Sequence, residues 1–126
     1  MKIIITGGKG FIGKNLIEYL KRYKYEIYKL SIDFNKENSK IIIEKIFKKF
    51  NPDYIIHLAG LAHNKDCNLL KTPNKIININ TKYPVFLSNL SKYYNVKKFI
   101  YISTIGVLGE GSKNEIVNEN SNYKPY

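Results

Sequence analysis

Short, largely apolar runs alternate along this chain with segments in which apolar residues recur every three or four positions. The runs at 3–6, 26–32, 53–58 and 99–103 have the composition of buried strands. Helical spacing predicts helices over about 11–20 and 41–50, the second ending at Asn51-Pro52. A long helix is expected from Pro73 or Asn74 through about Tyr94, and Pro84 should kink or restart it. Its buried stripe is expected at Ile76, Ile77, Ile79, Val85, Phe86 and Leu90.

This alternation predicts an α/β fold, because strands separated by helices form a parallel sheet with right-handed crossovers. In such sheets ligands bind beyond the carboxyl ends of the strands. Those ends are expected at Thr6-Gly7, Ser31 to Asp33, His57 to Gly60 and Ser103-Thr104. We therefore look for chemistry at these four places.

A glycine-rich turn follows the first strand and opens the first helix. It can be interpreted as G-x-x-G-x-x-G from Gly7 or as G-x-G-x-x-G from Gly8, and both patterns include Gly10 and Gly13. The first glycines permit a tight turn, the middle one lets the backbone approach a pyrophosphate, and Gly13 lets the helix pack closely on the strand. At the helix start, Phe11 and Ile12 would present free N–H groups to the phosphates. The turn predicts a Rossmann-type dinucleotide-binding domain over residues 1–126, with helices on both faces of its sheet.

Four segments together resemble one family, and they occur in that family's order. They are Ile5-Thr6-Gly7-Gly8, the run 52–60 ending in His57-Leu58-Ala59-Gly60, Asn80 within its helix, and the run 99–109. With them the chain resembles the extended short-chain dehydrogenase/reductases, the NAD(P)-dependent sugar-nucleotide epimerases and dehydratases. The resemblance implies NAD as cofactor with NADP left open, a nucleotide-sugar substrate, and hydride transfer at a sugar carbon. It also leaves room for a homodimer of a longer protein.

The resemblance assigns roles to residues at two of the strand ends. Leu58, Ala59 and Gly60 would line the cofactor, and His57 is expected to line or support it rather than to catalyse. His63, on the following loop, is either an exposed polar side chain or a substrate contact.

The family pattern S-[ST]-x-x-V-Y-G identifies the catalytic hydroxyl. Counted back from Val107 and Gly109, that role falls on Thr104, with Ser103 beside the cofactor. Leu108 departs from the usual tyrosine of this pattern. Asn80 matches a helix asparagine that faces the active site in this family, so it is expected to bind substrate.

The family's acid/base pair, Tyr-x-x-x-Lys, belongs on the helix after the strand that carries Thr104. The sequence ends at Tyr126, so we expect the domain to be cut before that helix and the sheet to be incomplete on its C-terminal side. The same spacing at Tyr25/Lys29, Tyr93/Lys97 and Tyr94/Lys98 is expected to be chance. Residues 1–126 alone should therefore be inactive. The alternative is a non-catalytic dinucleotide-binding module or pseudoenzyme.

The segment between the glycine turn and His57 is short for this family, which normally has two strands there. Only the run at 26–32 fits as a strand. Asp33 could bind the adenosine ribose, at about the expected 20 residues past Gly13. It could instead be a later family aspartate that contacts adenine, with Ser31 then in the ribose position. The absence of arginine near this strand end favours NAD.

Composition changes this picture little. The net charge is +11, but the lysines are scattered and Arg22 is the only arginine, so a solvated lysine surface is favoured over a nucleic-acid site. No apolar run is long enough to cross a membrane, and no Cys/His cluster has zinc spacing. With Cys67 as its only cysteine and no signal-peptide pattern, the chain is expected in the cytoplasm, without a metal, nucleic-acid or membrane partner.

Overall fold

The computed structural model describes residues 1–61, 73–109 and 117–124 of the chain. It contains four parallel strands in the order β2-β1-β3-β4. They are β1 (Lys2–Thr6), β2 (Glu26–Leu30), β3 (Tyr54–His57) and β4 (Lys98–Tyr101). The helices are α1 (Phe11–Leu20), α2 (Ser39–Phe50), α3 (Pro73–Ile77) and α4 (Tyr83–Tyr93), with shorter turns η1 (Lys21–Tyr23), η2 (Asn78–Lys82) and η3 (Ile105–Leu108). The predicted Rossmann-type sheet is confirmed.

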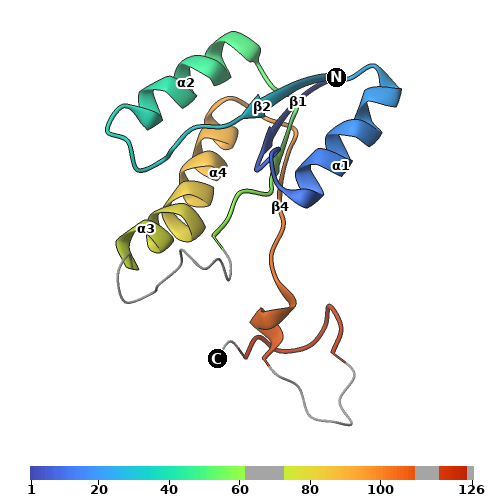
Figure 1. Cartoon of the computed structure of the whole chain (residues 1–126), viewed down its shortest axis with the longest axis vertical. Coiled ribbons are helices and arrows are strands. Elements are labelled where there is room, and N and C mark those ends of the chain that lie inside the picture. Colours follow the sequence, from blue (N-terminus) through green and yellow to red (C-terminus); the bar gives the residue numbers. More distant parts are fainter. Residues whose placement is uncertain (62–72, 110–116, 125–126) are drawn as a thin grey trace.

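Helices cover both faces of the sheet, as Figure 1 shows. Ile3 and Ile5 of β1 pack with Ile17 of α1 on one face. Between them Ile4 points to the other face, where α2 and α4 cover it. The larger core on that face consists of Ile4, Leu30, Ile43, Phe47, Ile55, Tyr83, Leu87 and Leu90. A strand buried on both faces must be apolar at every position, which explains the unbroken isoleucine run of β1.

The long helix predicted from Pro73 is interrupted. Between α3 and α4 lies η2, a π-helical segment of five residues, and Pro84 stands in the first turn of α4. The predicted restart at the proline is therefore confirmed. The predicted stripe is wrong in part, because Ile77 and Val85 are exposed and Leu87 is buried. A π-helical turn holds more residues than an α-helical one, so the buried positions after it shift along the sequence.

Three strands are shorter than predicted, and one of them is β3, which spans Tyr54–His57 rather than 53–58. β2 ends at Leu30 rather than Ile32, and β4 ends at Tyr101 rather than Ser103. Ser103 and Thr104 therefore lie beyond the sheet. The short spacing before His57 is confirmed, because β2 is the single strand between α1 and β3.

After β4 the described chain extends away from the sheet, at the bottom of Figure 1. There Lys124 donates its backbone N–H to the Val107 carbonyl, with an N–O distance of 2.9 Å. Gly109 has a φ of +81°, and a Cβ at this position would lie 2.7 Å from the Lys124 carbonyl oxygen. The two short stretches 105–109 and 117–124 therefore pack on one another.

Candidate functional site

The chain reverses between β1 and α1 at a position that only glycine fits well. Gly7 has a φ of +67°, in the left-handed region. A Cβ on Gly7 would lie 2.7 Å from the backbone nitrogen of Ala59. A Cβ on Gly8 would meet only side chains, the nearest being the Ile17 Cδ1 methyl at 2.9 Å. The pattern that starts from Gly7 therefore describes this turn better than the one from Gly8.

The remaining two glycines bring α1 close to the turn. A Cβ on Gly13 would collide with the Gly7 carbonyl oxygen and lie 2.7 Å from Gly8 Cα, so an α-carbon alone fits there. Gly10 is the N-cap of α1 and donates its N–H to the Gly7 carbonyl at 3.0 Å. It has no side chain to cap the helix, which leaves first-turn N–H groups free for another acceptor. Phe11 and Ile12, which follow, are 86% and 58% exposed.

A buried hydroxyl joins the ends of β1 and β3. Thr6 Oγ1 accepts hydrogen bonds from the backbone N–H groups of Leu58 at 3.2 Å and Ala59 at 3.1 Å. With both of these donors in place, its own proton is directed to His57 Nδ1, at 2.7 Å. Thr6 thus fixes the backbone of β3 where it leaves the sheet.

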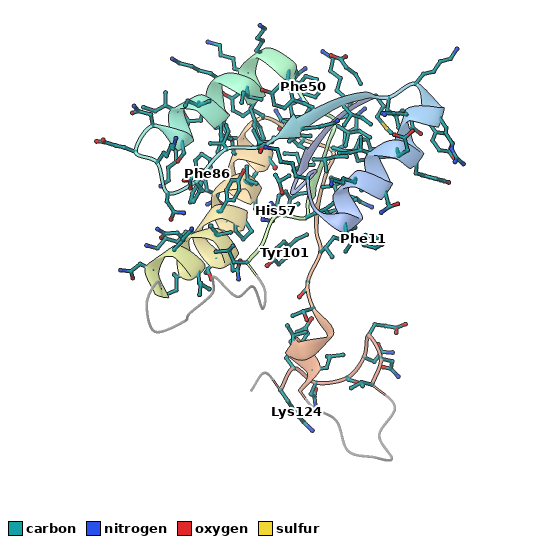
Figure 2. The ribbon with its side chains drawn as sticks, viewed as in Figure 1. Phe11, Phe50, His57, Phe86, Tyr101 and Lys124 are labelled. Carbon is teal, nitrogen blue, oxygen red and sulfur yellow. The ribbon has the colours of Figure 1, made fainter. Side chains whose placement is uncertain are left out.

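His57 is a neutral residue inside the fold. Figure 2 shows it between the sheet and the helices, and its side chain is 1% exposed. Burial lowers its pKa from 6.5 to about 4. Because Nδ1 accepts from Thr6, the imidazole proton is on Nε2, which is buried and has no hydrogen-bond partner among the described residues. The Tyr83 ring stands edge-on at 5.2 Å between centroids.

A pocket of about 300 Å³ opens where β1, β2 and β3 end. It brings together six of the predicted cofactor residues, which are Gly7, Gly10, Asp33, Leu58, Ala59 and Gly60. Four further residues line it that the sequence analysis did not assign to a site: Ile32, Phe34, Ile79 and Tyr83. Ile79 and Tyr83 stand four positions apart, the spacing of one helix face, which is the signal that could have identified them. Phe34 stacks on Tyr83 with centroids 4.4 Å apart and forms part of the apolar wall.

Asp33 is the acidic residue of this pocket. Its Oδ1 accepts from the backbone N–H of Asn35 at 3.1 Å and from the Asn35 side chain at 3.2 Å. These two bonds lower the pKa of the Asp33 carboxyl below its usual value, and the bond from the backbone N–H has the larger effect. Asp33 is therefore an anion at neutral pH, held in place at the rim of the pocket.

Asn80 lies in η2 and both ends of its amide are engaged with one residue. Its Oδ1 accepts from the Leu61 N–H at 2.8 Å, and its Nδ2 donates to the Leu61 carbonyl at 2.8 Å. The structure therefore places the predicted substrate residue against the backbone that follows β3. Its contact with substrate stays a prediction.

Ser103 and Thr104 lie beyond β4 and outside the pocket, and both are exposed. Thr104 Oγ1 accepts from the Gly106 N–H at 3.2 Å and caps η3, which contains Leu108. His63, for which the sequence left open an exposed position or a substrate contact, lies outside the described residues.

Within the described parts of the chain there is no group of three His, Cys, Asp or Glu side chains that could hold a metal. In the same residues, no helix is long and apolar enough to span a bilayer.

The parallel sheet, the glycine turn at the first strand end and the pocket beyond three strand ends define a Rossmann-type α/β protein. The model of the NAD dependent epimerase/dehydratase family matches residues 3–126, and the chain belongs to this family.

Individual relatives agree with this family. The chain is 34% identical over 152 aligned positions to a dTDP-D-glucose 4,6-dehydratase of Dictyostelium discoideum, covering 98% of this chain and 35% of the relative. Among solved structures, the UDP-glucose 4-epimerase of Thermus thermophilus in complex with NAD matches with a TM-score of 0.83 and 25% identity, over 99% of this chain and 45% of that one. The UDP-glucose 4-epimerase of Thermotoga maritima with UDP-glucose matches with a TM-score of 0.79 and 27% identity, over 100% and 45%.

The chain therefore spans less than half the length of these relatives. The alignment with the Dictyostelium protein runs over 152 positions although the chain has 126 residues. The relative therefore has residues, within the matched region, that have no counterpart here. This agrees with the single strand between α1 and β3.

Proposed function

We propose that residues 1–126 form the NAD-binding part of a nucleotide-sugar epimerase or dehydratase. The observation that carries the proposal is the pocket in which the glycine turn, Asp33 and the end of β3 meet. Parallel sheets with this connectivity bind dinucleotides at that edge. The names of the relatives support the sugar nucleotide as substrate class, and the NAD complex of the Thermus thermophilus epimerase supports the cofactor.

The residues present fit the chemistry of NAD. The pyrophosphate fits at Gly10, where no Cβ stands between the backbone and the pocket and the free N–H groups of α1 begin. The apolar wall of Ile32, Phe34 and Tyr83 suits the flat face of adenine. We propose that the Asp33 carboxylate, beyond its two bonds from Asn35, accepts a hydrogen bond from the adenosine, at the ribose hydroxyls or at the adenine amino group.

When bound, NAD supplies the hydride acceptor, and the chain's own residues position the partners of that transfer. We propose that the Thr104 hydroxyl hydrogen-bonds the sugar oxygen where charge develops and that Ser103 borders the cofactor. Thr104 Oγ1 accepts the Gly106 N–H with a lone pair as it caps η3, so its hydroxyl proton can still be donated to the sugar oxygen. Asn80 would contribute by holding Leu61, and through it the chain that leaves β3.

We further propose that the longer protein carries a Tyr-x-x-x-Lys helix after Thr104 and forms a homodimer. The coverage of less than half of each relative supports further chain in the family's proteins. The whole protein's activity depends on that chain.

The cofactor assignment is tested by a pair of matched alanine substitutions in one turn. Gly10→Ala adds a methyl group where the pyrophosphate would approach, 3.3 Å from the Gly7 carbonyl oxygen, which a small shift relieves. We expect at least tenfold weaker NAD binding by calorimetric titration, about 1.4 kcal/mol, with the fold retained. Gly8→Ala is the control, because Gly8 does not line the pocket and its Cβ meets a flexible side chain. Equal NAD affinity in a folded Gly10→Ala protein and the wild type would refute the assignment.

A further inference from the structure

A second hollow lies on the opposite side of the fold, along an edge of the sheet. Among the described residues β2 is the last strand of the sheet on this side, paired with β1 alone. A groove of about 440 Å³ runs between β2 and α2. Its floor is apolar, formed by Tyr28, Ile42, Ile46 and Phe50. We call this hollow the β2–α2 groove.

The β2–α2 groove is separate from the proposed NAD site. It shares no lining residue with the pocket at the strand ends. Its members include Glu26, which opens β2, and Phe50, which closes α2, so it lies at the end of the sheet away from the glycine turn. In Figure 2 the labelled Phe50 and Tyr101 stand at opposite ends of the sheet. Occupation of the groove therefore leaves the cofactor pocket free.

The β2 edge has the properties of a site for an added strand. An edge strand presents unpaired N–H and C=O groups that another extended chain can pair with. Next to this edge, large apolar side chains are solvent-exposed: Tyr28 is 37% exposed and Ile42 is 47% exposed. A strand added beside β2 would place every second side chain on the α2 face, over these residues.

The charge around the groove identifies the kind of strand. Lys45 and Lys49 line it from α2 and are exposed, and the lining holds one acidic residue, Glu26, which lies 3.9 Å from the Lys2 amine. A second copy of a chain with a net charge of +11 would bring lysines against lysines. An acidic chain would neutralise them.

The lining does not favour a nucleic acid. Bases bind by stacking on free aromatic faces, but the Tyr28 ring packs against Phe50 at 5.5 Å between centroids. The rest of the floor is aliphatic, and the adjacent edge consists of backbone amides that a strand matches.

We propose that the β2–α2 groove binds an extended acidic segment of a partner protein, which pairs with β2 as an additional strand. Among the side chains that this strand places on the α2 face, apolar ones lie over Tyr28 and Ile42 and an acidic one meets Lys45 and Lys49.

The proposal is tested with the 126-residue chain and a labelled, end-blocked peptide, Asp-Val-Glu-Glu-Glu-Ile-Asp, by fluorescence anisotropy, because its second, fourth and sixth residues put two apolar side chains and one carboxylate on the same face. We expect saturable binding that weakens with salt. Lys49→Glu should weaken it at least fivefold. Lys48→Glu is the matched control, because Lys48 lies in the same last turn of α2, is exposed and does not line the groove, so its effect should stay below twofold. A peptide N-methylated at every residue should bind at least tenfold more weakly, since neither of its edges can donate a hydrogen bond to β2.

Five results would overturn the proposal. They are no binding at millimolar peptide, an equal effect of Lys48→Glu and Lys49→Glu, full binding of the N-methylated peptide, tighter Lys49-dependent binding of oligo-dT, and a dimer in sedimentation that Lys49→Glu disrupts. The last two would assign the groove to a nucleic acid or to a second copy. NAD titration of Lys49→Glu is a separate measurement, so the failure of either proposal can be told from that of the other.

Discussion

Single buried atoms determine how the site is held, and the Thr6 hydroxyl is the best example. One oxygen accepts from two backbone N–H groups of β3 and lies 2.7 Å from His57 Nδ1. Two strand ends that are 51 residues apart in sequence are thereby fixed beside the glycine turn. The strand pattern predicted where Thr6 and His57 lie, but their contact depends on the register between β1 and β3, which the sequence does not specify.

The buried imidazole of His57 predicts a pH dependence of stability. Its pKa is about 4 in the folded protein and near 6.5 when exposed, so the unfolded chain binds the proton first as pH falls. Stability should therefore be unaffected by this group above pH 6.5 and fall between pH 6.5 and 4. The loss from pH 7 to 5 should be about 2 kcal/mol.

Urea unfolding at pH 7 and 5 measures this loss. His57→Asn is the matched variant, because its amide oxygen can still accept from Thr6 and it does not titrate. We expect the slope of unfolding free energy against pH in this range to fall to no more than half of its wild-type value. The lowered carboxyl pKa values of Asp33 and Asp53 act at more acidic pH and do not contribute here. An unchanged slope in His57→Asn would show that another group titrates.

Asp33 provides the test of cofactor preference. If its carboxylate accepts from the adenosine ribose, it also repels the 2′-phosphate of NADP. Asp33→Asn should then weaken NAD more than NADP, and we expect a change of at least fivefold in the ratio of the two dissociation constants. Calorimetric titration of both cofactors measures it. If NAD and NADP binding weakened equally, the contact of Asp33 would be assigned to the adenine rather than to the ribose.

At the scale of elements, the helix that precedes β4 differs most from the sequence pattern. A single apolar stripe was predicted, and η2 divides it, with Tyr83 and Leu87 buried in place of Ile77 and Val85. Apolar periodicity assumes one helical pitch, so it cannot register a segment with a different one. The strand boundaries that moved, at Leu30 and Tyr101, are set by pairing with neighbours rather than by local composition.

The π-helical segment places Asn80 opposite Leu61, and this contact should matter for cofactor binding. Asn80→Asp keeps the acceptor for the Leu61 N–H but sets a carboxylate oxygen against the Leu61 carbonyl. We expect a loss of about 1–3 kcal/mol in unfolding free energy and weaker NAD binding, because Gly60 precedes the displaced residue. The control is Asn89→Asp on α4, an exposed position outside the NAD pocket. Comparable losses in both variants would show that a general charge effect is responsible.

At the scale of the whole molecule, the parallel sheet and the glycine turn were predictable because they depend on local patterns and on general rules for strands that alternate with helices. The apolar wall of the pocket was not, because Phe34 and Tyr83 meet only when α2 and α4 pack on the same face. The strand order puts β2 at the edge of the described sheet. Under the proposed function, the pocket would hold the cofactor of a longer reaction centre.

The last prediction concerns whether residues 1–126 alone can catalyse, and we expect that they cannot. Thr104 can give one hydrogen bond to a reacting oxygen, but the Tyr-x-x-x-Lys spacings in this chain do not suit proton transfer there. Tyr25 directly precedes β2 and Lys29 lies within it. The other two pairs lie between the end of α4 and the start of β4, before Thr104 in the sequence. A general acid–base raises the reaction rate about 10²–10⁴-fold, and an oriented hydroxyl donor raises it about 10²–10³-fold. When such groups act as a unit, the absence of one removes most of the rate enhancement of both. We therefore expect weak NAD binding by the 126-residue chain and no turnover of dTDP-glucose or UDP-glucose, measured by nucleotide-sugar chromatography.

A longer chain that adds Tyr-x-x-x-Lys about 25 residues after Thr104 should be active. In it Thr104→Val should lower turnover more than tenfold with little change in NAD affinity, because the hydroxyl acts on the sugar oxygen and not on the cofactor. Thr104→Ser should keep most of the rate, because serine retains both the hydroxyl and the cap of η3, and valine removes both. If the purified 126-residue chain, free of host enzyme, already turned over either sugar nucleotide, the acid/base would have to lie within it. Tyr93 and Tyr94 would then be the first residues to replace with phenylalanine.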